Sequence, residues 1–191
     1  MIKKFSILLT FSFIIGSLTN INSQTIEAKN TTYFELAGKG LYYSFNYERN
    51  IVELNDKLSL QASIGFSLFP GMTDIKKSTD FTMPLELNFR YALNNNHNIV
   101  AGYGTTLYKY KLNDIDISNA NLSQEPLIPQ LKEVKEWFSH IVIEYRFQKP
   151  EGGLMYKAGF SPLQFAKMEN FAYQKKMNWA FSMNFGIGYA F

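Results

Sequence analysis

The last residues of the chain, MNWAFSMNFGIGYAF at 177–191, alternate strictly between large apolar side chains and small or polar ones. Successive side chains of an extended strand point to opposite faces, so this period of two predicts a strand with one bulky apolar face and one small polar face. Strands of soluble domains usually have about 5 or 6 residues, whereas a tilted strand needs roughly 9 to 11 to cross a bilayer. The segment is therefore typical of the closing strand of a membrane-spanning β-barrel.

The same alternation recurs along the chain and predicts eight strands in total. The clearest further segments are 57–68, 81–92, 136–148 and 41–49, and the weaker ones are 31–38, 97–109 and 153–161. Eight is an even number and the smallest strand count of bacterial single-chain barrels, and an even count returns both termini to one side. We expect an all-β fold, an eight-stranded antiparallel up-and-down transmembrane β-barrel over residues 24–191.

The lengths of the connections fit this topology, because such barrels have short periplasmic turns and longer external loops. The predicted periplasmic turns are short and rich in turn-forming residues, at 50–56, 93–96 and 149–152. The predicted external connections are 39–40, 69–80, 110–135 and 162–176. Only the first of them is short, since Gly38-Lys39-Gly40 is typical of a tight two-residue turn.

Side-chain volume distinguishes a membrane barrel from a soluble one. The lumen of an eight-stranded barrel is only wide enough for side chains to fill it, and the apolar faces carry too many Trp, Phe, Tyr, Met and Leu residues to fit inside. The opposite faces carry Gly, Ser, Asn, Thr and Ala, which fit a lumen. Aromatic residues at the predicted strand ends fit the two girdles of a membrane barrel: Tyr47, Tyr91, Trp137, Tyr145 and Tyr189.

Charged residues on the small-residue faces are expected to point into the lumen. They are Glu35, Glu48, Glu86 and Glu144 against Arg90, Arg146 and Lys157. Unpaired buried ions cost several kcal/mol each, so we expect pairing across neighbouring strands, most clearly for Glu86, Glu144 and Lys157. For Glu48 and Arg146, near the predicted periplasmic turns, the alternative is a position in water at the barrel end, where no partner is needed.

The N-terminus has the layout of a secretory signal peptide. Lys3 and Lys4 precede an apolar run at 5–18 and a polar exit that ends at Ser23. We expect a signal peptide at 1–23 and a barrel domain at 24–191; a retained anchor helix is the alternative, although the apolar run is short for one. Removing 1–23 takes away two lysines and no acids, so the formal charge falls from +3 to +1 over the remaining 168 residues. This near-neutral charge gives no argument for nucleic-acid binding, and with no cysteine the chain has no disulfide, thiolate metal site or lipidated cysteine.

Two segments resemble a known family. The turn Gly38-Lys39-Gly40 leading into 41–49 (LYYSFNYER) and the terminal Gly-Ile-Gly-Tyr-Ala-Phe at 186–191 resemble small outer-membrane barrels of the OmpX or OmpA-transmembrane-domain type. The resemblance implies localisation in the outer membrane and insertion by the barrel-assembly machinery, with the strand ending in Phe191 as its signal. It implies little about activity, because members include adhesion and resistance proteins, structural anchors and a few lipid-modifying enzymes.

Neither histidine lies in a recognisable catalytic motif. His97 is predicted in a solvated turn, and His140 is predicted to point into the lumen, where hydrogen bonding is the favoured role. A His beside a hydroxyl could serve a lipid-modifying enzyme, but no second His, G-x-S-x-G segment or carboxylate pair supports this. The acids Asp114, Asp116 and Glu125 lack the pattern of a calcium loop. We therefore predict no catalytic, cofactor-binding or metal-binding residue and no enzyme activity.

The external loops are the predicted recognition elements. The segment Pro126-Leu127-Ile128-Pro129 could contact a partner or cover the barrel rim. Aromatic residues of the last loop (Phe165, Phe171, Tyr173) lie among Lys167, Lys175 and Lys176, a mixture suited to lipopolysaccharide phosphates or a protein surface. The predicted function is a structural or interaction role, with outer-membrane lipids, lipopolysaccharide and extracellular or host surfaces as partners. A small porin or channel is the alternative, and a lipid-modifying enzyme is a third class.

Overall fold

The computed structural model describes residues 28–70, 79–114, 130–165 and 179–191. The predicted signal peptide at 1–23 lies outside these residues, as do the central parts of three predicted external loops. Among the described residues, no helix is both long enough and apolar enough to cross a membrane.

Antiparallel strands make up nearly all of the described chain. The long strands are β1 (Asn30–Ala37), β2 (Tyr43–Asn55), β3 (Leu58–Pro70), β4 (Thr79–Ala92), β5 (His97–Asp114), β6 (Gln130–Phe147), β7 (Gly153–Phe160) and β10 (Met183–Ala190). The short elements are the 3-10 helix η1 (Gly38–Gly40), β8 (Leu163–Phe165) and β9 (Trp179–Ala180).

The two short strands β8 and β9 are continuations of β7 and β10 across a local break. On β6, Ile143 is opposite Phe160 of β7 and His140 is opposite Leu163 of β8, so the register is unchanged. Likewise Phe160 is opposite Met183 of β10, and Leu163 is opposite Ala180 of β9. The chain therefore forms eight physical strands, as the alternation pattern predicts, although the predicted unbroken strand at 177–191 is interrupted at 181–182.

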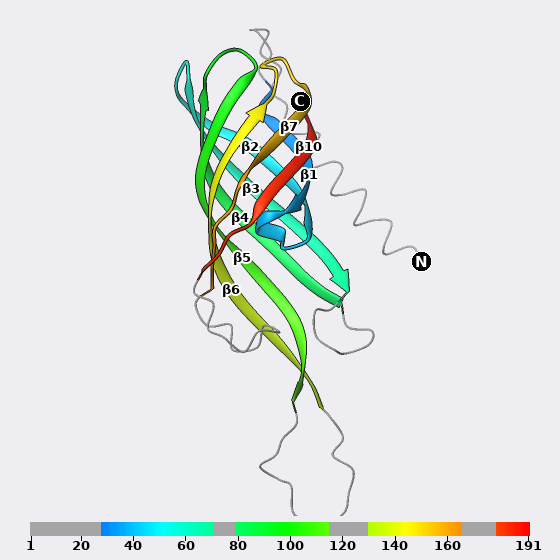
Figure 1. Cartoon of the computed structure of the whole chain (residues 1–191). Coiled ribbons are helices and arrows are strands. Elements are labelled where there is room, and N and C mark those ends of the chain that lie inside the picture. Colours follow the sequence, from blue (N-terminus) through cyan, green and yellow to red (C-terminus); the bar gives the residue numbers. More distant parts are fainter. Residues whose placement is uncertain (1–27, 71–78, 115–129, 166–178) are drawn as a thin grey trace, which may run out of the picture.

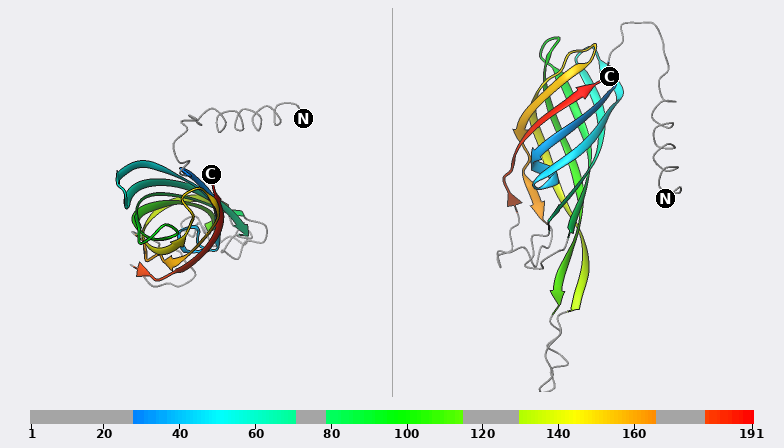
Figure 2. Two further views of the ribbon diagram at one scale, coloured as in Figure 1. Left: turned by 90° about the horizontal axis from the view of Figure 1, so that it is seen from above. Right: turned by 90° about the vertical axis from the view of Figure 1, so that its right-hand side faces the viewer.

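The eight strands close into a barrel in which each strand pairs with its neighbour in the chain. The order runs from β1 through β7, and β10 then pairs with both β7 and β1. The seam between β1 and β10 extends through seven opposed residue pairs, from Thr31–Ala190 to Ala37–Asn184. Figure 2 shows the ring viewed along its axis and the upright barrel from the side. This confirms the predicted eight-stranded antiparallel up-and-down β-barrel.

The hairpin of β5 and β6 extends beyond the rest of the barrel (Figure 1). Pairing of β4 with β5 ends at Lys109, and β8 pairs with β6 only from Phe138 onward. Residues 110–114 therefore pair only with 130–134. We call residues 109–114 and 130–135, which include the opposed pair Lys109–Lys135 at the base, the β5–β6 ribbon. The end of the barrel that carries the ribbon is the loop end, and the opposite end, with the three short turns, is the turn end.

Large apolar side chains point away from the barrel axis and polar ones point inward. On β10, Phe185 and Ile187 are each at least half exposed while the alternate residue Asn184 is buried. On β6, Ile143 and Tyr145 are exposed whereas Glu144 and Arg146 are fully buried. The predicted girdle residues Tyr91, Trp137, Tyr145 and Tyr189 are also exposed on the outer face.

Two predicted connections are wrong. The segment predicted as a turn at 50–56 belongs largely to β2, which continues to Asn55 with irregular register beside β3, so the turn contains only Asp56 and Lys57. The predicted two-residue turn at 39–40 is instead η1, whose three residues are all buried. A local period of two cannot show that a strand continues through a bulge or that a turn folds inward.

Candidate functional site

A network of ion pairs fills the middle of the lumen. Arg146 of β6 donates one hydrogen bond to each carboxylate oxygen of Glu48 on β2, one of them at 3.0 Å, and another at 2.8 Å to Glu144. All three side chains are buried. This bidentate arrangement is the strongest geometry for a guanidinium and a carboxylate. Glu48 and Arg146 are therefore buried partners, so their alternative position in water at the barrel end is wrong.

Lys157 of β7 extends this network to β1. Its ammonium lies 2.5 Å from Glu35 on β1 and 2.8 Å from Glu144 on β6. It also lies 4.2 Å from the ring centroid of Tyr33, within the range of a cation–π interaction. The prediction that Glu144 and Lys157 are paired interior charges is confirmed.

Lys39 of η1 supplies a third lumenal cation that the alternation pattern did not predict. Its ammonium donates to Glu86 on β4 and, at 2.8 Å, to the hydroxyl of Tyr33, and it lies 3.9 Å from Glu35. Only 1% of Lys39 is exposed. The Glu48–Arg146 pair joins β2 to β6 across the lumen, and Lys39 of η1 reaches Glu86 on β4. The Glu144–Lys157 pair joins the neighbouring strands β6 and β7, as predicted.

The η1 segment is held inside the barrel by its backbone as well as by Lys39. Thr106 donates to the Lys39 carbonyl at 3.1 Å, and Ser67 donates to the Gly40 carbonyl at 3.3 Å. The flanking residues Ala37 and Leu41 have φ values of 59° and 69°. Such values cost of order 1–3 kcal/mol for a residue with a side chain and persist only where the surroundings impose them. The lumenal contacts therefore stabilise an otherwise unfavourable backbone.

His140 of β6 contacts the network through Glu86. Its Nε2 lies 3.0 Å from Glu86 and its Nδ1 lies 3.4 Å from the Thr106 hydroxyl. Four carboxylates, those of Glu35, Glu48, Glu86 and Glu144, face the cations Lys39, Arg146 and Lys157 in this network. The predicted lumenal hydrogen-bonding role of His140 is consistent with these contacts.

A compact aromatic cluster fills the lumen at its loop end. Phe69, Tyr108, Tyr110, Phe138 and Leu163 are all buried and in mutual contact. The rings of Tyr108 and Tyr110 stack with centroids 4.7 Å apart, and the Tyr108 hydroxyl donates to Asp80 at 2.6 Å. With η1 and the ion-pair network beneath it, the cluster leaves the described lumen filled with side chains, as expected for eight strands.

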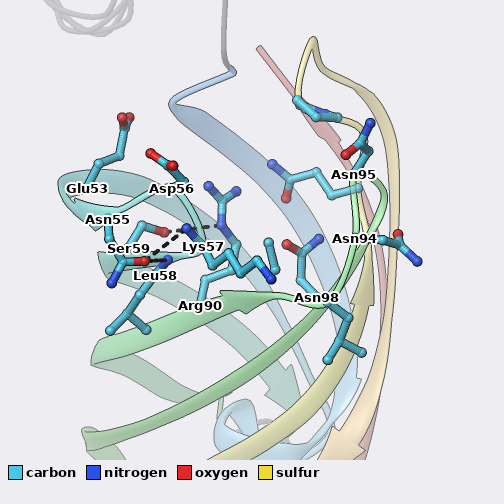
Figure 3. Close-up of a pocket in the computed structure, with 14 residues that line it drawn as sticks. Glu53, Asn55, Asp56, Lys57, Leu58, Ser59, Arg90, Asn94, Asn95 and Asn98 are labelled. Carbon is cyan, nitrogen blue, oxygen red and sulfur yellow. Dashed lines mark hydrogen bonds between the residues drawn. The ribbon is translucent and has the colours of Figure 1, made fainter.

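The turn end of the lumen opens into a polar pocket of about 470 Å³. Figure 3 shows Arg90 among Ser59, Asp56 and Lys57, with Asn94, Asn95 and Asn98 on the opposite side. Arg90 donates to Ser59 at 3.2 Å and is largely buried, as its predicted inward position requires.

The β5–β6 ribbon carries charged residues on its exposed face. Lys109 lies 2.9 Å from Glu133, and Lys135 lies 3.7 Å from the same carboxylate. The hydrogen bond from Lys109 lowers the pKa of the Glu133 carboxyl. Since Lys109 and Lys135 are directly opposed across the hairpin, Glu133 offsets the repulsion between them.

Several predicted loop residues lie outside the described part of the chain. They are Asp116, Glu125, the 126–129 segment, Lys167, Phe171, Tyr173, Lys175 and Lys176. Among the described residues, no group of three or more His, Asp or Glu side chains is arranged to hold a metal ion. His97, predicted in a turn, begins β5 and its ring contacts the hydroxyl of Tyr145.

Comparison with known proteins finds similarity only among solved structures. No family model and no curated protein matches the sequence. The N-terminal β-barrel domain of Pseudomonas aeruginosa OprF matches with a TM-score of 0.48 and 10% identity, covering 85% of this chain and 96% of that one. Ail, the attachment invasion locus protein of Yersinia pestis, matches with a TM-score of 0.48 and 8% identity, covering 85% and 97%. These are similarities in fold, and the strand pairing of the chain itself establishes that fold as a closed eight-stranded barrel.

Proposed function

We propose that this chain is an outer-membrane β-barrel with a structural or interaction role, and that its recognition elements are the β5–β6 ribbon and the connections 69–80, 110–135 and 162–176. The observation that carries this proposal is the inverted distribution of side chains: ion pairs inside the barrel and Phe, Leu, Ile and Tyr outside. Burial of charge is costly unless it is paired, and contiguous apolar surface is unfavourable in water. The lumenal charges are compensated by pairing, and the apolar outer face is favourable when acyl chains surround the barrel.

The exposed apolar residues lie on every wall of the barrel and support a lipid-facing band. Examples from well-separated strands are Phe45, Phe89, Ile143 and Phe185, each about half exposed. Monomeric soluble proteins rarely expose contiguous apolar patches larger than a few hundred Å². A belt around the whole barrel therefore supports insertion in a bilayer over a binding patch on one side.

The unequal lengths of the connections support one orientation. The three turns at one end are short, and both ends of the described chain meet there: Ala28 donates to the Pro150 carbonyl, and Asn30 and Phe191 exchange backbone hydrogen bonds. Short turns are typical of the periplasmic side. The loop end, with the β5–β6 ribbon, then faces the exterior, where its Lys109, Glu133 and Lys135 side chains are available to a partner.

The proposal includes partners that follow from this location. Outer-membrane lipids and lipopolysaccharide would contact the outer face, and extracellular or host surfaces would contact the loop end. The barrel-assembly machinery would recognise β10 and the terminal Phe191. We propose no nucleic-acid partner and no cofactor.

A loop-replacement experiment tests the recognition role. Alanine replacement of Lys109, Glu133 and Lys135, and separately of the connections 69–80, 110–135 and 162–176, is expected to reduce adhesion, complement resistance or lipopolysaccharide binding by cells that carry the chain. Replacement of the turn residues Asn94 and Asn95 is the matched control, because these lie at the opposite end. If none of the loop replacements alters any of the three properties while surface display is unchanged, recognition by the loop end is ruled out.

Channel and enzyme functions are tested separately. The filled lumen leads us to expect no steady conductance when the refolded protein is added to a planar bilayer, and stable single-channel openings would favour the porin alternative. For the enzyme alternative, His140→Ala is expected to leave the lipid A and phospholipid profile of cells unchanged. A changed profile at equal protein levels would support lipid-modifying chemistry.

A further inference from the structure

Arg49 is an isolated cation on the apolar outer face of the barrel. It lies on β2 between the inward-facing Glu48 and Asn50, so its side chain points outward, and it is half-buried. Its cross-strand neighbours are Asn30 on β1 and Ala62 on β3. Within the described residues, no acid forms a salt bridge with Arg49 and no side chain hydrogen-bonds to it.

Apolar surface lies on both sides of Arg49 along β2. Tyr47 precedes it on the same face, and Ile51, Val52 and Leu54 follow it toward the turn end, each at least 45% exposed. A guanidinium inside such a band is costly in a bilayer unless it reaches the interface or meets an anion. Because the turn end is the proposed periplasmic side, the headgroups within reach are those of the inner leaflet.

A hollow in the outer face begins at Arg49. It has a volume of about 570 Å³ and spans β2 to β5. Small residues, Ala62 and Thr105, and larger ones, Tyr47 and Tyr103, line it together with Arg49. Its size and apolar lining suit a flexible hydrocarbon chain, and Arg49 is the single cation in its lining.

We propose that Arg49 and this hollow form a phospholipid-binding site of the inner leaflet, in which the guanidinium holds the phosphodiester and one acyl chain lies over Ala62 and Thr105. Arginine matches phosphate geometrically because its planar N–H donors engage two oxygens at once. The headgroup thereby neutralises a charge that nothing else in the described chain neutralises. This inference rests on the proposed membrane location and adds a specific ligand to it.

A second hollow on the outer face provides an internal comparison. It has a volume of about 780 Å³ and lies on the other side of Tyr47 and Ile64, with Thr32 among its lining residues. No cation lines it in the described chain. The two hollows are therefore similarly apolar, and only the one with Arg49 offers a partner for a phosphate.

The test is native mass spectrometry of the detergent-purified barrel titrated with palmitoyl-oleoyl-phosphatidylglycerol or with palmitoyl-oleoyl-glycerol, which has the same chains and no phosphate. We expect one phospholipid to bind at least tenfold more tightly than the diglyceride. Arg49→Gln is expected to remove that difference, Arg49→Lys to retain part of it, and Ala62→Leu to weaken phospholipid binding by filling the hollow. Thr32→Leu, which fills the second hollow, is the matched control and should bind like the wild type.

Three results would overturn the inference. They are equal binding of the two lipids by the wild type, unchanged phospholipid binding by Arg49→Gln, and a tenfold preference for lipid A over the phospholipid. A fourth contradicting result would be a dimer that forms with the wild type and not with Arg49→Gln, because this face would then bind a second copy of the chain instead of a lipid. Heat-dependent gel migration of the same samples shows whether the barrel is folded and inserted in vesicles. Inserted barrels that bind no phospholipid would refute the Arg49 site alone. Failure to insert would refute the proposed membrane location.

Discussion

Replacing Lys39 with methionine tests whether the inward-folded η1 segment is held by its ion pairs. Methionine keeps the length and flexibility of the side chain but removes the ammonium that contacts Glu86, Glu35 and the Tyr33 hydroxyl. Breaking a buried ion pair by removing one partner costs about 3–5 kcal/mol, since an uncompensated charge remains. Glu86 keeps His140 and Glu35 keeps Lys157, so we expect the lower end of this range, about 3 kcal/mol.

The assay is equilibrium unfolding in urea of the barrel refolded in lipid vesicles. With a denaturant slope of about 2 kcal/mol/M, a loss of about 3 kcal/mol lowers the midpoint by about 1.5 M. Lys109→Met is the matched control, because it removes the same group from a pair with Glu133 in which both side chains are more than 40% exposed. Its expected effect is within about 0.5 kcal/mol.

A double variant makes the test specific for the contact. Lys39→Met combined with Glu86→Gln removes both charges of the closest pair, so its destabilisation should be smaller than the sum of the two single effects. The reasoning is refuted if Lys39→Met lowers the midpoint no more than Lys109→Met does. It is also refuted if the double variant is strictly additive.

Three further outcomes are expected. Gly104→Val should destabilise the barrel by about 1–3 kcal/mol in the urea assay, because a Cβ there would lie 2.7 Å from the Glu86 Cγ atom and displace the network. Ala101→Val, at an exposed position on the outer face of the same strand, is the spatial control, and equal effects would contradict the packing argument. Deletion of Phe191 should lower the amount of folded barrel in the outer membrane without changing synthesis, as measured by heat-dependent gel migration, and unchanged assembly would count against the terminal signal. Arg146→Met should destabilise at least as much as Lys39→Met, since Arg146 pairs with Glu48 and Glu144, and a smaller effect would show that the bidentate pair adds little.

The alternation of residue types was sufficient to predict the strands and the direction of their side chains. Successive side chains of a strand point to opposite faces, so the residue types of one strand are enough to distinguish its two faces. Glu144 and Arg146 could therefore be assigned to the lumen, and Ile143 and Tyr145 to the outside, before any partner was known. The strand count followed in the same way, and the breaks at 161–162 and 181–182 left the register unchanged.

The pairing inside the lumen could not be predicted from these patterns. Glu48 and Arg146 are 98 residues apart in sequence, and their contact depends on closure of the barrel. Lys39 was missed for a different reason: Gly38 and Gly40 are equally compatible with a tight turn at the surface and with a segment that folds inward. Charge provided a usable signal, because four inward glutamates faced only three inward cations in the predicted set, and one of these, Arg90, lies at the mouth of the lumen.

The most direct test of lipid-facing side chains uses a single fluorescent label, which the absence of native cysteines makes possible. Ile187→Cys places a bimane label on the outer face of β10, and Asp56→Cys places it in the exposed β2–β3 turn. In vesicles containing doxyl-labelled lipid, we expect strong quenching at position 187 by the lipid and little by aqueous iodide, with the reverse at position 56. Quenching at position 187 by iodide and not by the lipid would contradict a barrel whose apolar side chains contact acyl chains.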